Sequence, residues 1–285
     1  MNIRFVLSTV ALVLGLSATN ASAQVAYGTQ QGDDKYQPII GQKGKDVIWV
    51  PTNDAMADLM LKAANVGAND LVFDLGAGDG KIAITAAKNF GAQAVGIEYN
   101  QDLAALATRN AERAGVADKV KIIAGDIFVE DFSKATVVTM YLLPDLNLKL
   151  RPTILKMTPG TRIVANSFHM GDWEADQIIG TGQTQGYFWV VPGNAAGKWT
   201  ITGIDGGKAD TLELVQRYQK VGGTITLDGK SQPVLSGTLK GNQLRFSFID
   251  RSGQSRVFDV TLKGNSMTGS VHENLPIYEV SGTRN

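Results

Sequence analysis

The stretch Leu71-Val72-Phe73-Asp74-Leu75-Gly76-Ala77-Gly78-Asp79-Gly80-Lys81 decides how the rest of this chain is interpreted. Its first residues are apolar, which is typical of a parallel strand that is covered on both faces. Three glycines follow at alternate positions, so the backbone can turn sharply and lie close to a ligand. The alanine-rich run 82–87 then predicts a helix, whose free N–H groups attract an anionic group.

Strand and helix patterns alternate from this stretch to about residue 195. Further apolar strands are predicted at 94–98, 120–124, 136–143 and 162–166, and helices follow most of them. Repeated units of this kind form a parallel sheet wound by right-handed crossovers. We therefore predict an α/β fold with a Rossmann-like, mostly parallel sheet, and the run 187–191 is a candidate for its last strand.

The pattern changes after about Gly193, where the long helical runs end. Segments such as 224–227, 244–248 and 258–262 alternate apolar and polar residues, and turn sequences separate them. We predict a small antiparallel β domain, either a barrel or a sandwich. The predicted organisation is a signal peptide at 1–23, a polar, exposed lead-in at 24–45, an α/β domain at 46–195 and a β domain at 196–285.

The first 23 residues have the features of a secretory signal peptide. Arg4 supplies a positive charge, residues 5–16 are mostly apolar, and Ala21-Ser22-Ala23 matches the small-residue cleavage pattern. An apolar run of 12 residues (5 through 16) is shorter than the roughly 20 that a membrane-spanning helix needs. We predict cleavage after Ala23, export to the periplasm or the medium, and no stable membrane anchor in the mature chain.

The composition argues against several kinds of site and partner. Lys plus Arg and Asp plus Glu each number 27, so no charge excess favours nucleic acid as a partner. The chain has no cysteine, which excludes disulfides and thiolate metal ligands, and two histidines are too few for a histidine-rich metal site. We predict a site without a metal; the sequence leaves the oligomeric state open.

Acidic residues stand where the predicted parallel strands end, at the edge where ligands bind in wound sheets. Asp74 ends the strand before the glycine turn, Glu98 ends the next strand, and Asp126 follows the third. An acid at position 98 can accept both hydroxyls of a ribose, and Asp126 can accept the amino group of an adenine that Ile127 covers. Each feature alone has a purely structural explanation, but the three in this order favour a nucleoside ligand.

Together these residues resemble the motifs of the class I S-adenosylmethionine (SAM) methyltransferases. The acid at position 74 suits the ammonium group of SAM and would repel the pyrophosphate of a dinucleotide. The resemblance implies a Rossmann-like fold and SAM as the cofactor. The residues that it implies for SAM binding are Asp74, Gly76, Gly78, Gly80, Glu98, Tyr99, Asp126 and Ile127.

A narrower resemblance covers about residues 40–175. Val50-Pro51-Thr52, Gly96-Ile97-Glu98-Tyr99-Asn100 and Tyr141-Leu142-Leu143-Pro144 are similar to segments of a small group of lysine methyltransferases that modify mitochondrial membrane proteins. This resemblance implies an amine acceptor, a protein lysine, and a place for Tyr141 in the acceptor pocket. Tyr141 fits a core aromatic equally well, and His169 fits either a catalytic base or an incidental loop residue.

Two other hypotheses stay open at this stage. SAM is made in the cytoplasm, so an exported chain is also consistent with a non-catalytic binding protein on a methyltransferase fold, whose β domain binds a ligand or partner. Alternatively, the β domain is a barrel for an apolar ligand, and the first domain supports it. An open acceptor channel beside the methyl group would favour catalysis.

Overall fold

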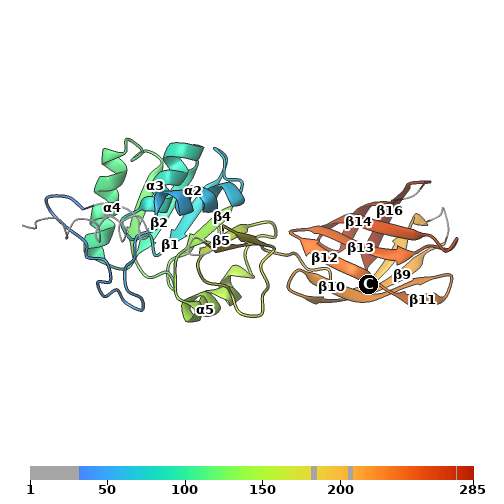
Figure 1. Cartoon of the computed structure of the whole chain (residues 1–285). Coiled ribbons are helices and arrows are strands. Elements are labelled where there is room, and N and C mark those ends of the chain that lie inside the picture. Colours follow the sequence, from blue (N-terminus) through green and yellow to red (C-terminus); the bar gives the residue numbers. More distant parts are fainter. Residues whose placement is uncertain (1–31, 181–184, 205–207, 274) are drawn as a thin grey trace, which may run out of the picture.

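The computed structural model describes residues 32–180, 185–204, 208–273 and 275–285, which form two sheets in sequence (Figure 1). The predicted signal peptide at 1–23 lies outside these residues. The first sheet and its helices are α2 (Asp54–Ala63), β1 (Leu71–Leu75), α3 (Lys81–Phe90), β2 (Gln93–Glu98), α4 (Gln101–Arg113), β3 (Val120–Ala124), β4 (Val137–Met140), α5 (Pro144–Ile154), β5 (Arg162–Asn166), β6 (Gln177–Ile179) and β7 (Gly186–Val190). The second sheet is made of β8 (Gly197–Thr202), β9 (Asp210–Arg217), β10 (Lys220–Leu227), β11 (Lys230–Pro233), β12 (Leu235–Lys240), β13 (Gln243–Ile249), β14 (Ser255–Lys263), β15 (Ser266–His272) and β16 (Tyr278–Arg284).

The first sheet has the strand order β3-β2-β1-β4-β5-β7-β6. Strands β1 to β5 run parallel, and β7 runs antiparallel to β5. The chain leaves β1 toward β2 and returns to the other side of β1 as β4, so the strand order reverses beside β1. Ligands bind at such a reversal, beyond the carboxyl ends of the strands. The predicted Rossmann-like sheet is confirmed, and the run 187–191 supplies its antiparallel strand.

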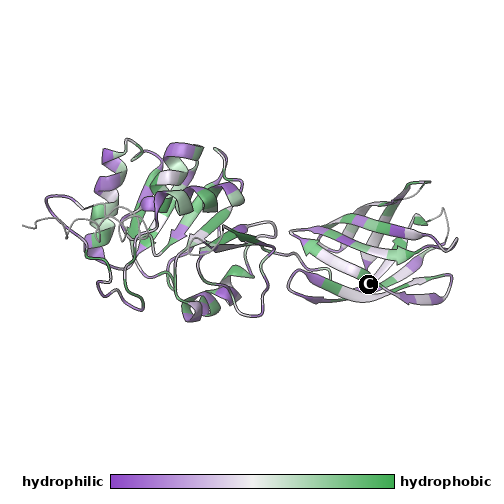
Figure 2. Ribbon diagram, viewed as in Figure 1, coloured by the Kyte–Doolittle hydropathy of each residue, from purple (hydrophilic) through white to green (hydrophobic). Residues whose placement is uncertain are grey.

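Strand β1 shows why both faces of this sheet are covered. Val72 belongs to the hydrophobic core on the side of α2 and α3, whereas Phe73 and Leu75 belong to the core on the side of α5. The alternation follows from the two-residue period of a strand. In Figure 2 the central strands are hydrophobic over most of their length, as expected for a sheet buried on both faces.

The second sheet closes on itself. Its order is β11-β10-β12-β13-β14-β15-β16-β8-β9, and β9 also pairs with β10, which makes an eight-stranded antiparallel barrel with β11 as an additional strand. The barrel interior is filled by large side chains that are almost fully buried, including Trp199, Phe246, Phe248 and Phe258. Of the two architectures predicted for this part, the structure is the barrel.

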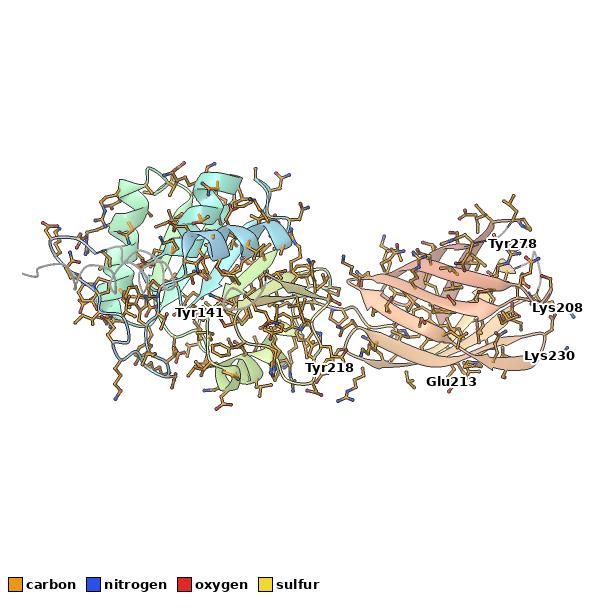
Figure 3. All side chains as sticks on the ribbon, viewed as in Figure 1. Tyr141, Lys208, Glu213, Tyr218, Lys230 and Tyr278 are labelled. Carbon is orange, nitrogen blue, oxygen red and sulfur yellow. The ribbon has the colours of Figure 1, made fainter. Side chains whose placement is uncertain are left out.

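The turn between β9 and β10 joins the barrel to the first domain. Tyr218 stacks on Trp173 with their ring centroids 6.0 Å apart, and its hydroxyl donates to Asp172 at 3.2 Å (Figure 3). Arg217 forms an ion pair with the same carboxylate at 2.8 Å. At this turn the two domains therefore meet through an aromatic stack and polar contacts.

Within the described ranges, none of the helices has the length and apolar character that crossing a membrane requires. The predictions about export and about the absence of an anchor concern residues 1–23, and they stay predictions.

Candidate active site

A cleft of about 920 Å³, its open mouth included, lies beyond the carboxyl ends of β1, β2, β3 and β4. It is lined by the predicted residues Asp74, Gly76, Gly78, Glu98, Tyr99, Asp126, Ile127 and Tyr141, and by a continuous segment, residues 42–52. The topology thus brings together residues from four strand ends. Of this segment, the sequence-based prediction used only Val50-Pro51-Thr52; residues 42–45 belong to the predicted exposed lead-in and instead line the cleft.

Gly78 is the point where the glycine turn comes closest to this segment. Its φ of 56° is left-handed, and a Cβ added there would lie 2.5 Å from Nε1 of Trp49. Any side chain at position 78 would therefore displace Trp49. Gly80, by contrast, is not among the lining residues. It begins α3 at a φ of 84°, where a Cβ would lie 3.0 Å from Ala107, so backbone geometry and helix packing account for this glycine.

Glu98 fixes the glycine turn to the end of β2. Its carboxylate accepts the N–H of Gly78 at 2.8 Å and the N–H of Asn100 at 2.9 Å. A carboxylate has about four acceptor positions, so these two bonds leave capacity for the two hydroxyls of a ribose. Burial raises the pKa of Glu98, and the backbone hydrogen bonds oppose that shift.

Two buried carboxyl groups lie beneath the turn. Asp74 is 2% exposed and accepts the hydroxyl of Thr139 at 2.8 Å. Burial raises its pKa to about 7, and the negative charges of Asp79 and Glu98 add to the shift. Asp79 is also 2% exposed, burial raises its pKa to about 6, and its Oδ2 has no hydrogen-bond partner among the described residues.

The unpartnered oxygen of Asp79 fits a cationic ligand group. Buried polar atoms are nearly always hydrogen-bonded, so such an oxygen calls for an explanation. The ammonium group of SAM would supply donors next to two carboxyl groups. Asp79 was not predicted as a binding residue, although an acid inside a glycine turn is a visible signal.

The raised pKa of Asp74 predicts pH-dependent binding of the cofactor product S-adenosylhomocysteine (SAH), which carries the same ammonium group. If only the ionised carboxylate binds it, the apparent affinity falls with the ionised fraction, roughly tenfold from pH 8 to pH 6. In the ligand-free protein, protonation of Asp74 stabilises the fold, because its pKa is higher in the folded state than the unfolded value of 3.8. This stabilisation is fully present below pH 3.8 and is lost as the pH rises through about 7. SAH should therefore raise the melting temperature more at pH 8 than at pH 6.

Calorimetric titration of SAH at several pH values measures this dependence directly. Asp74→Asn keeps the size of the side chain and removes its titration, so the pH dependence should shrink to the roughly twofold change that Asp79, with a pKa of about 6, still causes. A wild-type affinity that stays constant between pH 6 and pH 8 would contradict the assignment of Asp74 to the ammonium group.

Beside the end of β4, the cleft has apolar walls. Tyr141 is the first residue after β4, and its ring lies 6.4 Å from Phe168, centroid to centroid. Leu142, Leu146 and Pro51 line the cleft beside it. Tyr141 therefore lies at the cleft rather than wholly in the core, which is the position expected for an acceptor-pocket residue.

His169 is not among the residues that line the cleft. Its Nδ1 accepts the N–H of Gly171 at 2.9 Å, which in the neutral ring leaves the proton on Nε2. The ring thus forms a hydrogen bond within the loop after β5, which fits an incidental loop residue better than a catalytic base. In the described ranges, no group of three or more histidine and acidic side chains is arranged to hold a metal ion.

These features fit SAM along its length: buried carboxyl groups for the ammonium group, Glu98 for the ribose, Asp126 and Ile127 for the adenine, and apolar walls beside Tyr141 for the acceptor. The fit rests on this structure, since the buried Oδ2 of Asp79 has no other partner among the described residues.

Comparison with known proteins points the same way. The sequence model of the ANTKMT methyltransferase domain matches residues 74–177. A protein-lysine N-methyltransferase from Saccharolobus islandicus is 43% identical over 135 residues, which is 47% of this chain and 84% of that protein. A lysine N-methyltransferase of ATP synthase from Xenopus laevis is 31% identical over 138 residues, covering 47% of this chain and 59% of its own length.

One solved structure is similar in both sequence and fold. A protein from Salinibacter ruber, described as an RNA methyltransferase in complex with SAH, is 46% identical with a TM-score of 0.50. The match covers 51% of this chain and 95% of that one. The match to the family model ends at residue 177, within the first domain, and the chain spans 59% of the length of the Xenopus relative.

Proposed function

This chain belongs to the family of SAM-dependent methyltransferases found in these comparisons, and we propose that it transfers the methyl group to a lysine of a protein. The observation that carries the proposal is the similarity to the lysine methyltransferase of S. islandicus over most of that protein's length. The cleft supports it, because its lining combines buried carboxyl groups with apolar side chains beside Tyr141.

The roles of the residues follow from the geometry. In our proposal Asp74 and Asp79 bind the ammonium group, Glu98 the ribose, and Tyr99, Asp126 and Ile127 the adenine. Gly76 and Gly78 bring the backbone close to the cofactor. Gly80 adopts the left-handed conformation with which α3 begins, and it does not line the cleft.

The acceptor must be neutral to react. A free lysine has a pKa of about 10.4, so holding it neutral at pH 7 costs roughly 4–5 kcal/mol. The walls formed by Pro51, Leu142 and Leu146 disfavour the charged amine by desolvation. The hydroxyl of Tyr141 orients the nitrogen, and the proton leaves to solvent. When bound, SAM would supply the methyl group on its sulfonium sulfur, which is the leaving group of the transfer.

A second acceptor class has one specific observation in its favour. The Salinibacter protein is described as an RNA methyltransferase. Against RNA stands the balance of 27 basic and 27 acidic residues, because proteins that bind the phosphate backbone usually carry a basic surface.

We predict that methyl-labelled SAM, incubated with the wild-type protein and an extract of the source organism, transfers label to protein. The label should survive ribonuclease and disappear with protease, and hydrolysis should yield methylated lysine. Glu98→Ala serves as the inactive control, because it disables the proposed cofactor site. Label found only in RNA would reject the lysine proposal and keep the methyltransferase.

We also propose that the mature chain is exported, on the basis of residues 1–23. Mass spectrometry of the mature protein should find its first residue at or near Gln24, and an intact Met1 would reject export.

A further inference from the structure

Residues 33–52, here called the strap, lead to the start of α2 (Figure 1, dark blue). Its last part, residues 42–52, forms one wall of the cleft. Trp49 is 9% exposed and packs with Leu103 and Leu106 of α4, so this end of the strap is anchored by hydrophobic burial. Position 49 also lies against the glycine turn at Gly78.

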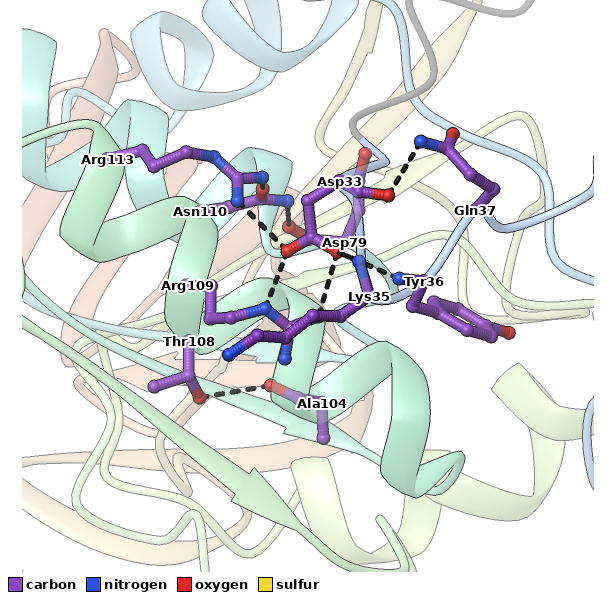
Figure 4. A network of polar contacts seen from close by, with 10 residues as sticks. All are labelled: Asp33, Lys35, Tyr36, Gln37, Asp79, Ala104, Thr108, Arg109, Asn110 and Arg113. Atoms are coloured by element: carbon purple, nitrogen blue, oxygen red, sulfur yellow. Dashed lines mark hydrogen bonds and ion pairs between the residues drawn. The ribbon is translucent and has the colours of Figure 1, made fainter.

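The other end of the strap is anchored by charge. The side chain of Asp33 is 8% exposed and accepts from Arg109 at 2.5 Å and from Arg113 at 3.0 Å (Figure 4). The hydrogen bond from Arg109 holds the pKa of Asp33 well below its usual range, so the pair stays charged at neutral pH. Arg113 also bonds Asn110, whose Nδ2 donates to the backbone oxygen of Asp79 at 2.8 Å, which links this anchor to the glycine turn.

Between the two anchors, Lys45 reaches into the adenine end of the cleft. Its Nζ donates to Oδ2 of Asp126 at 2.6 Å and lies 5.1 Å from the centre of the Tyr99 ring. The hydrogen bond raises the pKa of Lys45 and lowers that of Asp126, so both are charged at neutral pH. Oδ1 of Asp126 already accepts the N–H of Phe128 at 2.9 Å, which leaves Oδ2 as the oxygen that Lys45 holds.

We propose that Lys45 is a gate residue of the adenine subsite, whose ammonium group competes with the adenine amino group for Asp126. This inference rests on the proposed role of Asp126 in cofactor binding. Both groups are nitrogen donors to the same oxygen, and the Lys45 ammonium group lies 5.1 Å from the centre of the Tyr99 ring, in the space that the adenine would take beside that ring. The side chain of Lys45 is 37% exposed, and ion pairs in contact with water are weak enough to exchange.

The exchange gives the strap its function. Because the strap is anchored at Asp33 and Trp49, only the Lys45 side chain has to leave Asp126 to open the adenine end to the cofactor. Lys45 thereby sets the rate at which the cofactor enters and the affinity with which it binds, without contacting the reacting atoms.

The test is SAH binding to the full chain, measured by calorimetry and stopped-flow fluorescence. Lys45→Met keeps the length of the side chain and removes its charge. SAH should bind this variant about two- to fivefold more tightly, mainly through faster association, because an exposed ion pair no longer has to break. Lys35→Met is the matched control: it removes an exposed charge of the same strap away from the cleft, and should bind like the wild type.

A double-mutant cycle sharpens the result. In an Asp126→Asn background, Lys45→Met should have little further effect, since the competition has been removed. Weaker SAH binding by Lys45→Met would make Lys45 part of the bound site and overturn the gate, and unchanged rate constants would overturn it as well. If the wild type itself fails to bind SAH, the proposed cofactor site fails instead, so the two failures are distinguishable.

Discussion

Glu98→Ala will weaken the binding of SAH by about 10- to 100-fold. The carboxylate accepts two backbone N–H groups, from Gly78 and Asn100, and it is the proposed partner of the ribose hydroxyls. A hydrogen bond to a charged group contributes about 1.5–3 kcal/mol, and the loss of one such bond to the ligand accounts for the expected factor. Removing the bond to Gly78 also frees the turn that cradles the cofactor. Calorimetric titration of the variant measures the loss.

Two further variants separate the binding role of Glu98 from its structural role. Glu98→Gln retains one acceptor oxygen, so an intermediate loss is expected. Glu112→Ala removes an exposed acid from the end of α4 and should bind SAH like the wild type. If Glu98→Ala binds SAH with wild-type affinity while remaining folded, Glu98 is not a ligand of the cofactor.

The sequence was informative wherever local pattern determines position. Strand periodicity located the ends of β1, β2 and β3, and the parallel topology brings those ends to one edge. Asp74, Glu98 and Asp126 could therefore be placed together at the cleft without any contact being known. The apolar strand pattern likewise predicted a sheet covered on both faces.

The strap could not be predicted in this way. Lys45 meets Asp126 across 81 positions, and Asp33 meets Arg109 across 76. Neither pairing has a periodic signal, and the polar composition of the segment favoured an exposed lead-in. The burial that leaves Asp79 without a partner is also a property of the packed structure. The closure of the barrel depends on the pairing of β9 with β10, and strand patterns alone fit a sandwich equally well.

Arg256→Met will strongly destabilise the barrel. Arg256 and Asp250 form an ion pair at 2.7 Å, and their side chains are 3% and 2% exposed. Replacing one member leaves a buried carboxylate without its counter-ion, which typically costs about 3–5 kcal/mol. Burial acts to raise the pKa of Asp250, but hydrogen bonds from Ser252 and Arg256 hold it at about 2, so the carboxylate is charged in the wild type. Thermal unfolding followed by circular dichroism measures the effect.

The same variant tests whether the two domains are independent. The barrel meets the first domain mainly through the turn at Tyr218, and the first domain has its own hydrophobic cores. We therefore expect Arg256→Met to lower a transition of the barrel while SAH binding stays at the wild-type level. Arg245→Met is the control, because that side chain is 58% exposed and pairs only loosely with Asp259 at 3.7 Å, so its melting temperature should change little. If SAH binding is lost at the same temperature at which the barrel unfolds, the two domains unfold as one cooperative unit.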